Sequence, residues 1–210
     1  MTCANENSER IVRFDGLEYP LEGSPPGLQA EAPDFLVSQW NDYCKIEVDL
    51  QNLLNDGRPI LLTTSHTVDA PGSVLQLLNL EFMLRKFDRK VLSFHVSSDL
   101  PFTQNRFFRE HNIKNITAGS DYRYGSFVDY GVMLRDERVL CRSAFIIDQE
   151  GVVQYVEILK QLSDELNYNA IERQLIEACT AACRAGDAVN LDPESESVAP
   201  ESPENRSFDE

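Results

Sequence analysis

Basic residues are scarce in this sequence. Its 210 residues include 19 Lys and Arg against 35 Asp and Glu, which gives a net charge of −16 and a pI near 4.5. Nucleic acids and anionic membranes are bound through clustered positive side chains, and no basic cluster is evident along the chain. We therefore expect neither nucleic acid nor a membrane surface as the main partner.

Long apolar runs and secretion signals are absent as well. No apolar run approaches the ~20 residues that span a bilayer, and the N-terminal "MTCANENSER" lacks the charged and apolar regions of a signal peptide. We therefore expect a cytoplasmic protein. Its five cysteines are an odd number without a disulfide-scaffold pattern, so they are expected to be thiols.

The motifs that hold cofactors are also missing. The sequence has no Gly-rich phosphate loop. Cys179 and Cys183 are spaced i, i+4, but no His or second Cys pair lies near them in the sequence to complete a metal site. We interpret this pair as small residues on the buried face of the last helix, and we predict no cofactor and no metal.

What the sequence does contain is the alternating pattern of an α/β protein. Strands are expected in a hairpin at 11–21 with its turn at Asp15-Gly16, and at 35–39, 44–48, 59–64, 90–96, 115–119, 139–147 and 152–159. Helices are expected at Asp49, from Asp69, at 100–111, around 125–132 and at 167–185. Strands alternating with helices predict a mixed sheet covered on both faces.

These elements define three regions of the chain. We expect a flexible N-terminus at 1–10, one folded domain at 11–185 and an acidic disordered tail at 186–210. The tail holds eight acids against one Arg, and its Ser, Pro and Glu content leaves it too little apolar surface to fold.

Five short strings occur in an order and spacing that resemble a known family. They are "VRFDGLEYPL" near the N-terminus, "APDF" at 32–35, "SSDLPFTQNRFF" at 97–108, "YGV" at 130–132 and "RSAFIIDQEGVV" at 142–153. Together they resemble the thiol peroxidases, the atypical two-cysteine branch of the peroxiredoxins, from about Ile11 to about Ala178. The resemblance implies a thioredoxin-like α/β fold, with a mixed sheet flanked by helices and an N-terminal β-hairpin.

The resemblance also implies a chemistry that depends on two cysteines. In this family a loop of the form Pro-x-x-x-Thr-x-x-Cys opens the helix after the first core strand, and an Arg from a later strand supports the thiolate. The thiolate attacks a peroxide and becomes a sulfenic acid. A second cysteine resolves the sulfenic acid, and thioredoxin reduces the resulting disulfide.

Both of these cysteines are missing here. Anchored on "GSV" at 72–74, the pattern places Thr63 at the Pro, Thr67 at the Thr, Ala70 at the peroxidatic Cys, Phe108 at the resolving Cys and Arg142 at the Arg. No cysteine lies between Cys44 and Cys141, so no shift of the alignment restores the chemistry. A single Cys→Ala exchange would explain Ala70 alone. The three departures together indicate a natural loss of the peroxidase cycle.

Other residues offer only weak substitutes for the missing sulfurs. Cys141 neighbours Arg142, but successive strand residues face opposite sides of a sheet, so Cys141 faces away from a pocket that Arg142 faces. Cys44 lies in an early hairpin, outside the expected pocket. His66 with Thr67 or Ser65 could act as a base and a nucleophile, yet adjacent residues seldom align for this, and no G-x-S-x-G motif is present.

The retained residues of the loop allow two interpretations. Thr67 is either a ligand-orienting hydroxyl or part of the turn before the helix. Asp69 is a natural helix N-cap, and we hypothesise that it supplies the counter-charge of Arg142, because a buried guanidinium without a partner would be destabilising. Thr63, Thr67, Asp69 and Arg142 are thus the candidate pocket, and no catalytic residue is expected.

Three functions follow from this reading. The leading hypothesis is a thiol-peroxidase-like protein that has lost cysteine-based peroxide reduction and acts in binding or regulation. The first alternative is an active thioredoxin-dependent peroxidase that uses an unforeseen cysteine, with thioredoxin as its partner. The second is a small-anion site at Thr67 and Arg142. The resemblance also implies a homodimer, and the apolar residues on several sides of the helix after Asp69 fit a shared interface or simple burial.

Overall fold

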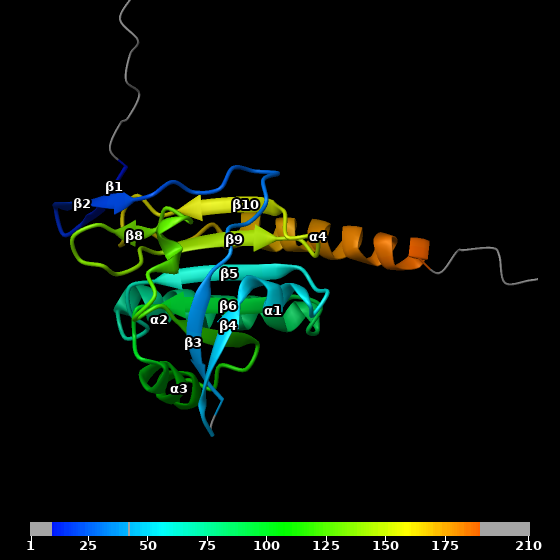
Figure 1. Cartoon of the computed structure of the whole chain (residues 1–210), viewed down its shortest axis with the longest axis horizontal. Helices are drawn as coiled ribbons and strands as arrows, with labels where there is room; N and C mark the ends of the chain where they lie inside the picture. The colour runs from blue at the N-terminus through cyan, green and yellow to red at the C-terminus, as the bar shows by residue number, and fades with distance from the viewer. Residues whose placement is uncertain (1–9, 42, 190–210) are drawn as a thin grey trace, which may run out of the picture.

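The computed structural model describes residues 10–41 and 43–189 and centres on a seven-stranded mixed sheet (Figure 1). In spatial order the strands are β10 (Val153–Ile158), β9 (Ser143–Ile147), β5 (Ile60–Ser65), β6 (Leu92–Ser97), β7 (Ile116–Ser120), β3 (Leu36–Trp40) and β4 (Lys45–Asp49). β5, β6 and β7 are parallel neighbours, and the outer strands pair antiparallel. The mixed α/β sheet predicted from the sequence is confirmed.

A smaller sheet forms at the N-terminal hairpin. β1 (Ile11–Phe14) and β2 (Leu17–Glu22) pair antiparallel, and β2 also pairs with β8 (Met133–Leu134). Asp15 and Gly16 both have positive φ, 49° and 79°, as the two central residues of such a tight hairpin turn require. The predicted hairpin is confirmed. The strand expected at 139–147 is shorter than predicted, since β9 begins only at Ser143 and Leu140 instead forms an isolated bridge with Met133 of β8.

Helices and loops cover both faces of the large sheet. They are α1 (Leu50–Leu54), α2 (Pro71–Leu84), η1 (Arg85–Phe87), α3 (Pro101–Glu110), η2 (Ser126–Val128) and α4 (Tyr168–Val189). Leu61 of β5 belongs to a core cluster with buried residues of α2, α3 and α4, whereas its neighbours Ile60 and Leu62 belong to a cluster with residues of α1 and η2. Since alternate strand residues face opposite sides, the two clusters lie on opposite faces of the sheet.

Two helices bury less of their apolar surface than the sequence indicates. On α2, the side chains of Leu75, Leu78 and Phe82 are 53%, 39% and 67% exposed, so the helix is not covered on all of its apolar sides. On α4, Cys183 is exposed, which corrects the prediction that it lies on the buried face of this helix, and the apolar Ile176 is exposed as well. The buried face of this helix consists instead of Ile171, Leu175 and Ala178, with Cys179 partly buried.

The ends of the domain lie close to their expected positions. β1 begins at Ile11, and α4 continues to Val189, which is four residues into the predicted tail. Residues 1–9 and 190–210, on which the expected flexible N-terminus and most of the tail fall, lie outside the described residues. Among the residues that are described, no helix combines the length and the apolar character needed to cross a bilayer.

Candidate functional site at the start of helix α2

The candidate site begins where β5 delivers the chain to α2. All six residues of β5 are buried, and α2 starts at Pro71. Proline suits the first helical position, because its fixed φ fits the helix and its missing N–H would have no partner there. The N-cap is therefore Ala70, which offers no side-chain cap, and the prediction that Asp69 is the N-cap is wrong by one residue.

Asp99 holds the loop in place. Its Oδ1 accepts a hydrogen bond of 2.8 Å from Thr67 Oγ1, and its Oδ2 accepts bonds from the Val68 N–H (2.8 Å) and Ser97 Oγ (2.7 Å). Thr67 Oγ1 also accepts from the Asp69 N–H at 3.3 Å. The hydroxyl of Thr67 is thus engaged in shaping the turn. Asp99 was not singled out from the sequence, although it lies within the string at 97–108 that carries the family resemblance.

Arg142 is completely buried and its guanidinium is bonded to protein groups. Nε donates to Gln76 Oε1 at 2.9 Å, and Nη1 donates to the carbonyls of Leu162 (3.0 Å) and Asp164 (2.6 Å). Nη2 donates to Glu165 Oε1 at 3.3 Å. Four of the five N–H groups of this arginine therefore have protein partners.

The first turn of α2 packs directly against this guanidinium. A Cβ atom added at Gly72 would lie 2.8 Å from Arg142 Nη1 and 3.3 Å from its Cζ. A residue larger than glycine would therefore have to displace a buried, hydrogen-bonded group. Arg142 thus joins α2 to the loop at 162–165 through hydrogen bonds to both.

The proposed pairing of Asp69 with Arg142 is wrong. The ion-pair partner of Arg142 is Glu165, and Asp69 lies 3.7 Å from Arg106, with both of these side chains more than half exposed. The physical reason is burial, because Arg142 is completely buried whereas more than half of the Asp69 side chain is exposed to solvent. Gln76 and Glu165 were not found by sequence reasoning, since only the fold brings them to the arginine.

Thr63 belongs to a separate buried network below the loop. His95 of β6 lies between two residues of β5, with its Nδ1 2.9 Å from Thr63 Oγ1 and its Nε2 3.0 Å from Ser65 Oγ. Burial, together with the positive charge of Arg142, lowers the pKa of His95 to about 3, so the ring is neutral near pH 7. The distance from Ser65 to His95 would suit a nucleophile and a base, but both residues are fully buried and no substrate can reach them.

His66 is affected by the charges of both Arg142 and Asp99. Burial lowers its pKa, the nearby positive charge of Arg142 lowers it further, and Asp99 acts in the opposite direction. Its Nδ1 is buried and has no hydrogen-bond partner among the described residues. The serine beside His66 bonds to His95 instead, so the structure does not join His66 to a nucleophile.

The described cysteines lie outside this site. Cys141 is fully buried in the core cluster on the other face of the sheet, and burial raises its pKa to about 12. Cys44 is exposed beside β4, while Cys179 and Cys183 lie on α4. At the position implied for the resolving cysteine, Phe108 is buried and packs against Phe107 at a ring-centroid distance of 6.2 Å.

Comparison with known proteins identifies the family. Residues 28–156, more than half of the chain, match the model of the AhpC/TSA family. The chain belongs to the AhpC/TSA family. A thiol peroxidase of Helicobacter pylori is 33% identical to this AhpC/TSA-family protein over 171 residues, which are 78% of this chain and 98% of that protein. The thiol peroxidase family predicted from the sequence is therefore confirmed.

Further matches agree with this assignment. A thiol peroxidase of Aquifex aeolicus is 41% identical over 85 residues, which cover 39% of this chain and half of that protein. Among solved structures, a peroxiredoxin-like protein from Aquifex aeolicus superposes with a TM-score of 0.70 at 28% identity, covering 80% of this chain and 97% of that one. The thioredoxin-like fold expected from the sequence is confirmed.

Proposed function

We propose that this member of the AhpC/TSA family does not reduce peroxides by cysteine chemistry and acts as a binding or regulatory protein. The observation that carries the proposal is the start of α2, where the resemblance implies a reactive thiolate. The residue there is Ala70, and no described cysteine lies in the loop or bonds to Arg142. Without a thiolate, the first bond-making step with a peroxide oxygen has no nucleophile.

The environment of Arg142 supports the same proposal. In a working peroxidase site a guanidinium stabilises the thiolate and the reacting oxygens, and it needs free N–H groups for this task. Here four of its five N–H groups bond to Gln76, to Glu165 and to two carbonyls. A guanidinium with these partners serves to hold the helix and the loop together.

The test is peroxide consumption with thioredoxin, thioredoxin reductase and NADPH. We expect turnover at the level of the protein-free background, with an authentic thiol peroxidase as the positive control. Oxidation of NADPH that depends on the full chain and disappears in Cys44→Ser or Cys141→Ser would overturn the proposal. That result would establish the alternative, an active thiol peroxidase, which the names of the relatives favour.

An anion site at Thr67 and Arg142 finds less support. Thr67 bonds to Asp99, and Arg142 bonds to a different set of protein groups. A ligand that binds only the native state raises the apparent stability. A thermal-shift screen with carboxylates and phosphates is therefore expected to show no effect, and a shift that is lost in Thr67→Val would contradict this expectation.

We also propose that the binding surface includes the outer face of α2 and that its partner is a second copy of the chain. Leu75, Leu78 and Phe82 are spaced i, i+3, i+7, so they form one exposed apolar stripe that begins next to the site loop. The family resemblance implies a homodimer near these loops, which supports the choice of a second copy.

Sedimentation velocity tests the dimer. We expect the wild-type chain to sediment as a dimer and Leu78→Glu to sediment as a monomer with unchanged circular dichroism. Leu28→Glu, at another exposed leucine, is the matched control. A monomeric wild-type chain at 100 µM would refute the dimer, and dissociation of both variants would refute the assignment to α2.

A further inference from the structure

A basic hollow lies at the end of the molecule where α4 ends, away from the site loop. It has a volume of about 710 Å³. Arg58, Arg89 and Lys90, from the loops that precede β5 and β6, line one side, and Ala182 and Cys183 of α4 line another. The hollow therefore has both a cationic wall and a wall of small, largely apolar side chains.

Two of its cations, Arg89 and Lys90, have side chains without an ion-pair or hydrogen-bond partner among the described residues. Arg58 bonds to Asp56 and donates from Nη1 to the carbonyl of Arg89 at 2.6 Å, which holds the loop in position. Arg58 is thus paired with an acid, whereas the charges of Arg89 and Lys90 are not paired within the described residues.

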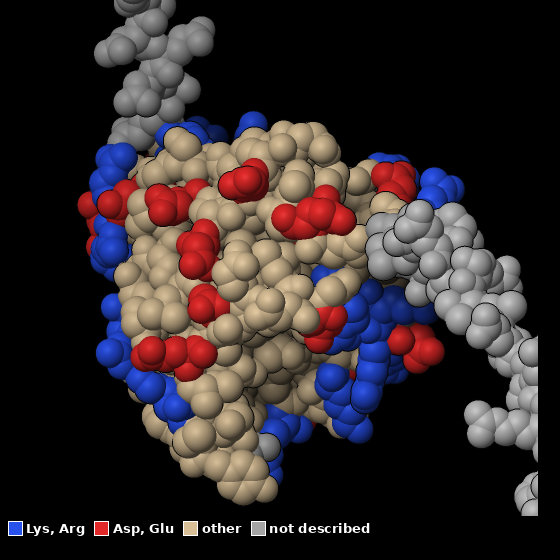
Figure 2. Space-filling view, turned by 45° about the vertical axis from the view of Figure 1, so that its right-hand side comes forward, with Lys and Arg blue, Asp and Glu red and all other residues tan. Residues whose placement is uncertain are grey.

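The basic surface continues beyond this hollow. Lys114 joins Arg58 and Arg89 in lining an adjoining hollow of about 170 Å³. Figure 2 shows Lys and Arg side chains gathered on the side of the molecule where α4 ends. The statement from the sequence that the chain has no basic cluster is therefore wrong, because the fold brings Arg58 and Lys114 to the basic string "RKFDRK" at 85–90.

The chain carries the complementary charge just beyond this point. α4 ends at Val189, six residues after Cys183, and residues 190–210 contain seven acids and one Arg. Twenty-one extended residues span about 70 Å, so length alone lets this segment reach any surface of the domain. What distinguishes the hollow is that Arg89 and Lys90 line it together with Cys183, which lies only six residues before the end of α4.

We propose that the acidic segment 190–210 docks in this basic hollow of its own chain, with its carboxylates on Arg89 and Lys90 and its apolar residues against α4. Tethering makes the contact intramolecular, at an effective concentration in the millimolar range. Weak pairs at exposed side chains therefore suffice to populate the docked state. Because such pairs are screened by ions, the docking weakens as salt rises.

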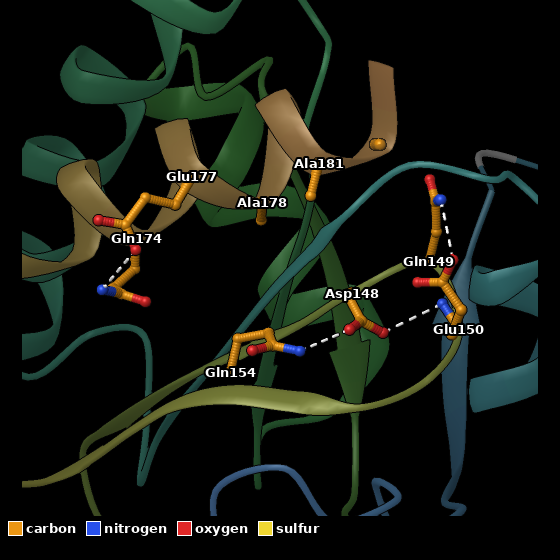
Figure 3. Close-up of a pocket in the computed structure, with 9 residues that line it drawn as sticks. Asp148, Gln149, Glu150, Gln154, Gln174, Glu177, Ala178 and Ala181 are labelled. Atoms are coloured by element: carbon orange, nitrogen blue, oxygen red, sulfur yellow. Dashed lines mark hydrogen bonds between the residues drawn. The ribbon is translucent and has the colours of Figure 1, made fainter. Parts of the chain in front are cut away.

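The charge of the neighbouring surface directs the segment to one side of α4. Figure 3 shows the hollow on the other side, between α4 and the turn that joins β9 to β10, where Asp148, Glu150 and Glu177 are among the lining residues. Its volume is about 250 Å³. Carboxylates of the segment are repelled there, and Glu150 lies at the border between the two hollows.

Zero-length carbodiimide crosslinking of the full chain tests the docking. The reagent joins a lysine amine to a carboxylate in direct contact, with loss of water, and mass spectrometry locates the bond. In 20 mM salt we expect Lys90 to be linked to acids of 190–210 at least tenfold more than Lys160. We expect 0.5 M NaCl to remove this preference.

Lys160 is the matched control. It is exposed, and it shares a basic hollow of about 360 Å³ with Arg10 and Arg13, toward the end of the molecule opposite the end of α4 (Figure 1). General attraction of an acidic segment to basic surfaces would give similar yields at both lysines, and that result would overturn the proposal.

Two further measurements complete the test. Arg89→Glu leaves Lys90 in place, and we expect it to lower the Lys90 yield at least fivefold without changing the circular dichroism. A mixture of ¹⁴N- and ¹⁵N-labelled chains distinguishes the partner. Crosslinked peptides with hybrid labelling would show that the segment binds a second copy, and an unchanged yield in Arg89→Glu would show that the hollow is not the docking surface. Either result refutes the proposal.

Discussion

Replacement of Arg142 by methionine separates a structural role from a ligand-binding role for this arginine. The change keeps much of the side-chain length but removes the charge and all five donors. It leaves Gln76 Oε1 and the carbonyls of Leu162 and Asp164 without the bonds of 2.6–3.0 Å that they now accept. These acceptors are buried or partly buried, and solvent replaces their lost partner poorly.

The expected loss of stability follows from these contacts. Each buried acceptor left without a donor costs about 1–3 kcal/mol, and the change leaves three such acceptors. We expect Arg142→Met to lower the free energy of unfolding by about 4 kcal/mol. Globular domains have total stabilities of about 5–15 kcal/mol, so this is a large fraction of the whole.

Urea unfolding at pH 7, followed by circular dichroism, measures the effect. Glu165→Gln is the matched control, because Glu165 has a 40% exposed side chain 3.3 Å from the guanidinium, and its neutralisation is expected to cost at most about 1 kcal/mol. An Arg142→Met variant as stable as the wild type, or more stable, would refute the reasoning. It would indicate that Arg142 is kept for a ligand at the expense of stability.

Three further predictions concern single positions. Burial raises the pKa of Asp121 to about 6, so the charged carboxylate destabilises the fold above that pH, and this penalty disappears below about pH 4. In urea titrations, Asp121→Asn should therefore raise the unfolding free energy by about 2 kcal/mol at pH 7 and leave it unchanged at pH 4. Equal effects at both pH values would contradict this prediction. Gly72→Ala should lower the free energy of unfolding, measured in urea, by about 1–3 kcal/mol, because the new Cβ meets the buried Arg142. An unchanged urea midpoint would show that the arginine can move. Burial raises the pKa of Cys141 to about 12, so this thiol should resist iodoacetamide at pH 8 in the native protein and react in urea. The exposed Cys44 should react under both conditions, and peptide mapping measures both reactions. Rapid labelling of Cys141 in the native protein would refute its burial.

Much of the fold could be predicted because local patterns and tertiary packing agree. The Asp-Gly turn of the first hairpin and the apolar run of β5 form as expected. The errors occur where a local signal competed with a stronger one. Asp69 has the chemistry of an N-cap, but Pro71 sets the start of α2 one residue later.

The candidate site was predictable only in part. Thr67 and Ala70 lie in the loop that the family pattern indicates, and the pattern also pointed to Arg142. Their partners were not predictable, because Asp99 and Glu165 lie more than twenty residues away from Thr67 and Arg142 respectively. Burial similarly could not be assigned on α4, where apolar periodicity did not distinguish the packed Leu175 from the exposed Ile176.

The sequence by itself determined the family, the order of strands and helices, and the absence of any cysteine between Cys44 and Cys141, because these depend on residue identity and local periodicity. Only the tertiary structure decided that Asp69 and Arg142 are not partners, and that Arg58, Arg89, Lys90 and Lys114 gather at one end of a chain with a net charge of −16. The physical reason is that charge pairing depends on distance and burial in space, which folding sets between residues far apart in sequence.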